Sequence, residues 1–129
     1  MRIISFAETT PALLAGRKTC TRRAWKSSYA RQFHFGARVL AYDKSPRAGG
    51  KPVAIIELSA WPVLSDKLRL PLPLTDWEAE GFAYMEEHGL ALFGGATPRQ
   101  VWDSWARPGG TNGLYVIRFR LVEVCDGQS

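Results

Sequence analysis

The chain has 129 residues, 46% of them hydrophobic and 22% charged, which indicates one globular domain over residues 1–129 and excludes a disordered chain. The net charge is +5, yet residues 9–42 contain seven Lys or Arg and no Asp or Glu. So local a charge favours a polyanion such as nucleic acid over an acidic membrane, because the segment lacks the long apolar face of an interfacial helix.

The first half of the chain is predicted to alternate short strands with short helices. Residues 2–7 read as a strand, and residues 9–16 as a helix with Thr10 as cap, Pro11 in the first turn and Gly16 past the end. Residues 27–33 predict a helical turn that Ser27 or Ser28 caps. Residues 37–43 have strand composition, residues 44–52 form a loop, and residues 53–64 are a long β-rich run that Pro62 ends or places at an edge.

The second half predicts two capped helices and a final strand. Residues 69–74 (RLPLPL) cannot be helical, whereas residues 75–89 begin with Thr75 and Glu78 at capping-box spacing and end at Gly89. Residues 97–106 start with a second box, in which Thr97 is the cap and Gln100 stands at the third helical position. Residues 114–124 alternate apolar and basic side chains as a strand does. This order predicts an α+β fold, a small, mainly antiparallel barrel with peripheral short helices.

Several kinds of site are excluded by missing motifs. The two cysteines, Cys20 and Cys125, have no partner motif, so we expect neither a disulfide framework nor a cysteine-rich zinc site. We expect the protein to work in a reducing compartment. The chain has no phosphate-binding loop of the G-x-x-x-x-G-K-[ST] type and no G-x-S-x-G, and its two histidines are not spaced as metal ligands. No stretch approaches about 18 apolar residues and no secretory signal is evident, so we expect a cytoplasmic protein without a membrane segment.

An acidic metal site stays open on the sequence alone. The acids are Asp76, Glu78, Glu80, Glu86 and Glu87. For Asp76 and Glu78 we favour a solvated helix face near a helix N-terminus, where the dipole favours acids. We therefore predict no metal and no other cofactor.

Five segments resemble those of ASCH domains, which belong to the PUA-like superfamily. They are GRKTCTRR (16–23), FGARVLAYD (35–43), DWEAEGF (76–82), VWDSWA (101–106) and YVIRFRLV (115–122). The resemblance covers nearly the whole chain and implies a single ASCH domain with a PUA-like β-barrel, surrounding helices and a cleft. Family members are linked to RNA binding, some small bacterial members remove the acetyl group from N4-acetylcytidine, and a nuclease activity has been proposed within the family.

The resemblance implies a catalytic trio. Members with amidohydrolase activity use a lysine and a threonine of a G-x-K-T-x-T element and a glutamate of the middle helix, which correspond here to Lys18, Thr21 and Glu80. The chain departs from these members in its more basic TRRAW segment and its longer middle region, which affects the expected substrate. We expect a hydrolase acting on N4-acetylcytidine-like nucleosides. The alternative is an RNA-binding module, with single-stranded RNA or a modified nucleotide as ligand and possible metal-dependent ribonuclease activity.

The chemistry of the trio depends on the protonation of Lys18. A threonine hydroxyl needs a base, and a lysine serves only if its pKa falls from about 10.4 to about 7.5. Burial and the neighbouring arginines lower that pKa, whereas a close Glu80 raises it. The plain alternative is a Lys18–Glu80 salt bridge, with Thr21 chosen for β propensity, since residues 18 and 21 face opposite sides of a regular strand.

The rest of the basic stretch is predicted to bind the ligand of a monomeric protein. The expected binding residues are Arg17, Thr19, Arg22, Arg23, Trp25 and Lys26. Trp25 stands among arginines, a combination suited to stacking on a nucleobase. The other four tryptophans are expected in the core.

Overall fold

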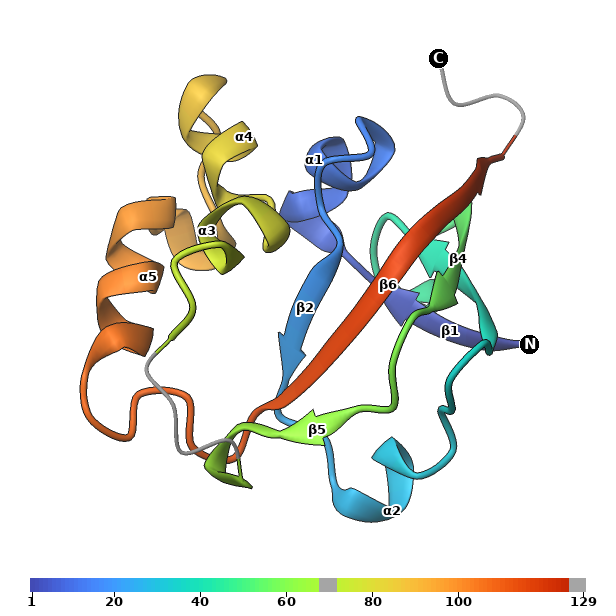
Figure 1. Cartoon of the computed structure of the whole chain (residues 1–129). Coiled ribbons are helices and arrows are strands. Elements are labelled where there is room, and N and C mark those ends of the chain that lie inside the picture. The colour runs from blue at the N-terminus through green and yellow to red at the C-terminus, as the bar shows by residue number, and fades with distance from the viewer. Residues whose placement is uncertain (68–71, 126–129) are drawn as a thin grey trace.

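The computed structural model describes residues 1–67 and 72–125 (Figure 1). Among these residues, six strands form one curled sheet in the order β1-β3-β4-β6-β2, with β5 also paired to β6. The strands are β1 (Arg2–Ser5), β2 (Cys20–Arg23), β3 (Arg38–Tyr42), β4 (Pro52–Leu58), β5 (Val63–Leu64) and β6 (Tyr115–Val124). The result is an α+β half-barrel, as expected in outline.

The sheet is mixed, because one strand pair is parallel. β1 pairs with β3 in parallel, whereas β3–β4, β4–β6, β2–β6 and β5–β6 are antiparallel. A parallel pair needs a long crossover connection. Here that crossover runs through α1 (Thr10–Leu14), β2 and α2 (Ser27–Ala30).

The remaining α-helices lie together beside β2 (Figure 1). They are α3 (Asp76–Ala79), α4 (Phe82–Glu87) and α5 (Pro98–Ala106). Trp77 and Phe82 pack edge-on to Trp102, which joins the three helices into one cover. Short 3-10 turns complete the chain at Ala7–Thr9, Pro46–Ala48, Ser65–Lys67 and Phe93–Gly95.

The main core lies on one face of the curled sheet. On β6, Ile117 and Phe119 point into this core, whereas Arg118 and Arg120 point to the other face of the sheet, as the alternation predicted. Leu13 of α1 and Phe33 after α2 pack against the same core and are fully buried.

The helix predicted over residues 75–89 is divided at Gly81. Gly81 has φ +86°, a left-handed conformation that ends α3 and precedes α4. A β-carbon at this position would lie 2.8 Å from the Ala12 β-carbon and 3.2 Å from that of Lys18. The break therefore lets the chain pass directly over α1 and Lys18. The predicted capping box is wrong as well, because Thr75 precedes α3 but its side chain caps nothing.

Other predicted boundaries differ in smaller ways. The Thr97–Gln100 capping box is confirmed at both of its hydrogen bonds. α1 ends before Gly16 as predicted, but Thr9 rather than Thr10 precedes it, and no serine caps α2. The β-rich run 53–64 divides into β4 and β5, and the predicted non-helical residues 69–74 lie partly outside the described residues. Within the part of the chain described, no helix has the length and apolar character needed to cross a membrane.

Candidate functional site

The backbone after α1 places three alternate side chains on one side of β2. The amide of Lys18 donates to the Ala12 carbonyl, and the amide of Thr19 donates to the Ala79 carbonyl at 2.7 Å. The segment is thereby held between α1 and the end of α3. Lys18, Cys20 and Arg22 then alternate along the strand toward α3, where all three reach Glu80.

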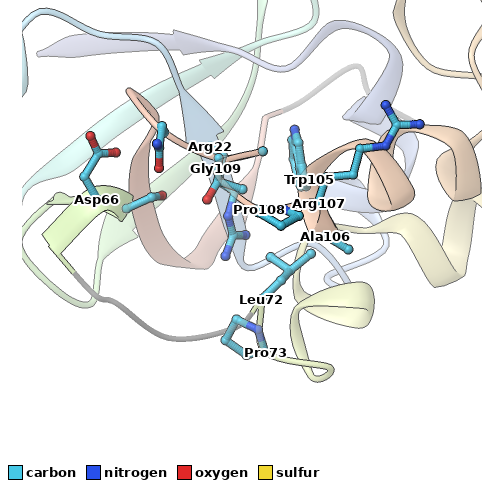
Figure 2. A pocket seen from close by; sticks show the side chains of 13 residues that line it. Arg22, Asp66, Leu72, Pro73, Trp105, Ala106, Arg107, Pro108 and Gly109 are labelled. Carbon is cyan, nitrogen blue, oxygen red and sulfur yellow. The ribbon is translucent and has the colours of Figure 1, made fainter.

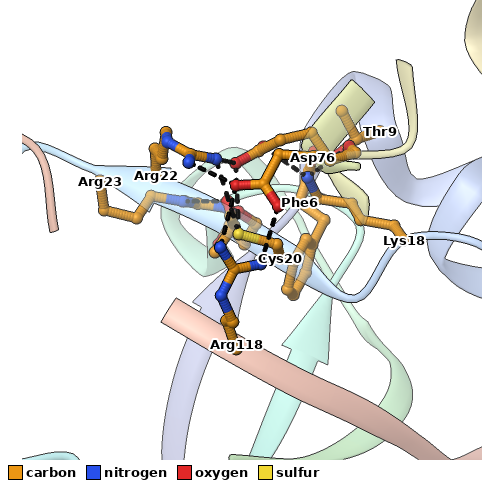
Figure 3. Close-up of polar contacts among 11 residues, drawn as sticks. Phe6, Thr9, Lys18, Cys20, Arg22, Arg23, Asp76 and Arg118 are labelled. Carbon is orange, nitrogen blue, oxygen red and sulfur yellow. Dashed lines mark hydrogen bonds and ion pairs between the residues drawn. The ribbon is translucent and has the colours of Figure 1, made fainter. Parts of the chain in front are cut away.

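Glu80 is the centre of this buried polar cluster, since it contacts Lys18, Cys20 and Arg22. Figure 3 shows these three residues together with Asp76 and Arg118. Lys18 Nζ lies 3.2 Å from Glu80 Oε1 and donates to the Glu80 carbonyl at 2.7 Å, and both side chains are only 2% exposed. Arg22 Nη1 donates to Glu80 Oε2 at 2.7 Å, and the Cys20 thiol donates to the same oxygen at 3.5 Å. Both carboxylate oxygens are therefore occupied.

Asp76 is the second buried carboxylate. Arg22 Nη2 donates to Asp76 Oδ2 at 2.5 Å, and Arg118 binds both oxygens at 3.0 and 2.9 Å. Arg118 stands opposite Cys20 in the β2–β6 register, directly beside this arrangement. Arg22 thus bridges two carboxylates that lie four residues apart, a spacing that puts them on one side of α3.

Thr21 and Arg23 face the other side of β2. Arg23 Nε donates to Thr21 Oγ1 at 3.0 Å, and Arg23 Nη2 donates to the Ser5 carbonyl at 2.7 Å. The guanidinium lies 5.4 Å from the centre of the Phe6 ring, and Thr21 is only 4% exposed. The hydroxyl is therefore buried next to a cation that donates to it.

Burial sets the protonation of the cluster. Desolvation lowers the pKa of Lys18, Glu80 opposes that shift, and the positive charge of Arg23 adds to it. Burial alone would raise the pKa of Asp76, but hydrogen bonds from Arg118 and Arg22 hold it below its usual range. Burial and the Glu80 charge raise the pKa of Cys20 to about 12, so this thiol stays protonated and is a poor nucleophile.

The structure brings only part of the predicted site together. Lys18 and Glu80 are in contact, and Arg22 joins them. Thr21 is buried close by in the chain, but among the described residues no hydrogen bond joins it to Lys18. The partner of the Thr21 hydroxyl is Arg23. The separation of Thr21 from Lys18 is expected, because residues 18 and 21 face opposite sides of a regular strand.

Four other predicted binding residues lie outside the cluster. Arg17 turns outward to Glu78 at 2.8 Å and to Glu87 at 2.6 Å. Thr19 and Lys26 are exposed. Trp25 stacks on Phe33 with ring centres 4.5 Å apart and packs against the hydrophobic core, where we had expected it to stack on a ligand.

Sequence analysis missed two of the main contributors, Asp76 and Arg118. The interpretation of Asp76 as part of a solvated helix face is wrong, since Asp76 is 2% exposed and bound by two arginines. The signal available was the four-residue spacing of Asp76 and Glu80 opposite basic residues on β2 and β6. Within residues 1–67 and 72–125, no three His, Cys, Asp or Glu side chains are grouped to hold a metal ion.

Comparisons with known proteins place the chain by its fold. No protein-family model matches the chain, and no curated protein matches it. The crystal structure of protein EF3133 from Enterococcus faecalis V583, a DUF984 protein, matches with a TM-score of 0.55 and 18% sequence identity. The match covers 95% of this chain and 75% of that one. At this identity the likeness shows a shared fold, which holds a buried Lys–Glu–Arg–Asp cluster in the present chain.

Proposed function

We propose that this chain is a PUA-like ASCH domain with amidohydrolase activity, and that its substrates are acylated nucleosides resembling N4-acetylcytidine. The observation that carries the proposal is the environment of Lys18, a fully buried amine whose pKa burial lowers and which Glu80 holds at 3.2 Å. Buried lysines with depressed pKa values are typical of catalytic bases. The resemblance of the G-x-K-T-x-T and E-G-F elements to those of the small amidohydrolases supports the same role.

In the proposed reaction, Thr21 is the nucleophile and Lys18 the base. Neutral Lys18 takes the hydroxyl proton as Thr21 Oγ attacks the acyl carbonyl carbon, and Arg23 donates to the oxygen that becomes negative. When the C–N bond breaks, Lys18 returns the proton to the departing nucleoside amine. Water then attacks the acyl-threonine ester with Lys18 again as base, which releases the carboxylic acid and restores the hydroxyl.

For this reaction substrate binding has to redirect two hydrogen bonds, and it has to bring the Thr21 hydroxyl, which faces the opposite side of β2, within reach of Lys18 Nζ. Lys18 Nζ donates to Glu80, and Thr21 Oγ1 accepts from Arg23. If an acyl oxygen takes over the Arg23 donor, the hydroxyl is released toward a base. Glu80 accepts a hydrogen bond from Arg22 at 2.7 Å through one carboxylate oxygen. Its other oxygen binds the Lys18 amine and positions it.

The same contacts argue against the alternative, an RNA-binding surface built from the basic stretch. Arg17 and Arg22 are bound to carboxylates, and Arg23 to Thr21 and a backbone carbonyl. The exposed Lys26 and Arg31 remain from that stretch as phosphate contacts. RNA binding stays a prediction, to be tested by whether affinity for short single strands falls with salt at about −0.7 per neutralised phosphate in a log–log plot.

Turnover of N4-acetylcytidine by purified protein tests the proposal. Lys18→Arg keeps the charge but cannot give up its proton, so we expect it to lose turnover nearly as fully as Lys18→Ala. Thr21→Ser should retain some rate and Thr21→Val none. The rate should rise with pH through the lowered pKa of Lys18. Folded protein without turnover on any N-acyl nucleoside would refute the function, and near-normal turnover by Lys18→Arg would refute the mechanism.

A further inference from the structure

Two pockets of similar volume lie at opposite ends of α5. The pocket at the end of α5 measures about 350 Å³, and it adjoins the buried cluster because Arg22 forms part of its wall (Figure 2). The pocket at the start of α5 measures about 360 Å³ and is lined by residues 89–91 and 97–99 together with Glu86. Within the described part of the chain, no residue of the buried cluster lines this second pocket. It is therefore a separate feature of the helix cover.

The chain between the two walls of this second pocket forms a closed turn with Phe93 at its tip. The Leu92 amide donates to the Ala96 carbonyl at 2.7 Å, and the Gly95 amide donates to the Leu92 carbonyl at 3.0 Å. Gly94 and Gly95 have φ of +71° and +78°, a conformation that glycine adopts without strain. Backbone hydrogen bonds thus hold the turn, while the Phe93 residue is 85% exposed.

A second exposed apolar side chain lies in the helix cover. Among the described residues, Phe93 and Leu74 are the most exposed large apolar residues, at 85% and 84%. The Trp77 amide donates to the Leu74 carbonyl, and the Trp77 ring centre lies 4.1 Å from the guanidinium of Arg99, which lines the pocket. These features therefore adjoin one another. Exposed apolar patches mark sites where soluble proteins associate.

The charges at the pocket indicate which partner fits. Glu86 and Arg99 both line the pocket, lie 3.9 Å apart, and have side chains that are 54% and 56% exposed. An exposed pair of this kind gains little energy on its own, so both charges stay available to a partner. A strongly acidic or strongly basic partner would meet one like charge. A second copy of the chain, related by a two-fold axis beside the turn, places each Glu86 opposite the other copy's Arg99.

We propose that two copies of this chain associate through the helix cover, and that Phe93 of each copy fills the pocket at the start of α5 in the other. Such an interface uses the same surface twice and closes at two copies. A buried aromatic anchor supplies much of the binding energy of an interface. Because the contact is small, we expect a weak dimer with a Kd in the micromolar range. The proposal replaces the expectation of a monomer and does not depend on the proposed function.

Sedimentation equilibrium of the full chain, from about 10 μM to about 1 mM, tests the association. We expect a dimer whose Kd rises at least about 30-fold in Phe93→Ser, the effect of losing a dominant interface residue. Phe35→Ser is the matched control, because Phe35 is 62% exposed but lies between α2 and β3, outside the helix cover. Circular dichroism should show both variants folded, since neither side chain is buried in the single chain.

Charge reversal tests the two-fold arrangement. Glu86→Arg gives each copy two positive charges at the pocket, and Arg99→Glu gives each copy two negative charges. We expect each variant alone to be monomeric and a mixture of the two to form a heterodimer, because both cross pairs are then opposite in charge. A wild-type chain that stays monomeric throughout overturns the proposal and assigns the exposed turn to a different protein. A dimer that Phe93→Ser leaves intact, or charge variants that stay apart when mixed, also overturns it.

Discussion

Arg118 and Arg120 stand two residues apart on one face of β6, and each binds a carboxylate. Arg118 binds Asp76, which is 2% exposed, whereas Arg120 binds Glu57, which is 26% exposed and is shared with Arg38. The strand pattern is the same at both positions. The difference lies mainly in the acids, because Asp76 on α3 is buried whereas Glu57 on β4 is partly exposed; the Arg118 side chain is itself 39% exposed and that of Arg120 58% exposed. The buried carboxylate of the covered pair, Arg118–Asp76, must keep its partners because a lone buried charge is costly, whereas the open pair, Arg120–Glu57, competes with water and salt.

The largest effect on stability is expected from removing the buried acid, Asp76. Asp76→Asn keeps the shape but takes away the charge that compensates Arg22 and Arg118. We expect the free energy of unfolding to fall by about 3–5 kcal/mol, the usual cost of leaving a buried partner unpaired. Urea denaturation followed by circular dichroism measures it. A loss below about 1 kcal/mol would mean that water reaches the cluster freely.

The second largest effect is expected at Gly81, where the cover formed by α3, α4 and α5 passes close to α1. Gly81→Ala introduces a β-carbon into a left-handed position 2.8 Å from the Ala12 β-carbon. We therefore expect the free energy of unfolding to fall by about 1–3 kcal/mol, the cost of such backbone strain. Gly89→Ala is the matched control, with φ +63° and open space around the new carbon. Equal losses in the two variants, read from thermal unfolding, would show that the close approach to Ala12 has no importance.

Acid should weaken the covered pair selectively. The pKa of Asp76 is held below its ordinary value of 3.8, so its contribution to stability is complete above that pH and is lost as pH falls through the lower, folded value. The wild-type unfolding midpoint in urea should therefore drop steeply below about pH 4. Asp76→Asn should show a shallower drop over the same range. Parallel curves for the two proteins would contradict the assigned pKa.

The smallest effect is expected at the open pair. Glu57→Gln removes the carboxylate that Arg38 and Arg120 share, and we expect a loss of only about 0.2–1 kcal/mol. The loss should shrink further in 0.5 M salt, where such pairs are screened. A salt-independent loss as large as that of Asp76→Asn would remove the distinction between the two arginines.

Local signals predicted the fold in outline. The alternation of Ile117 and Phe119 with Arg118 identified β6, and the Thr97–Gln100 box identified the start of α5, because both patterns act through near neighbours. The parallel β1–β3 pair was not predicted, since strand partners depend on how distant segments pack. The same holds for the break at Gly81, which serves the approach of Ala12.

The candidate site was predictable only where a motif carried it. The G-x-K-T-x-T and E-G-F elements pointed to Lys18 and Glu80, which the structure brings into contact. The inward turn of Arg22 was not predictable from the charge of residues 9–42, because its partners come from α3. The excess of basic residues suggested a surface, yet Lys18 and Arg22 are buried against Glu80 instead.

The position of β6 in the sheet has a consequence for synthesis of the chain. β6 pairs with β2, β4 and β5, so three strands depend on a strand that is made after all of them. A nascent chain that stops before Tyr115 lacks Arg118, which binds Asp76, and lacks β6, with which β2 pairs. Assembly of the site should thus wait until translation has passed residues 115–124, and pulse proteolysis of stalled chains should show protection of β2 appearing only then.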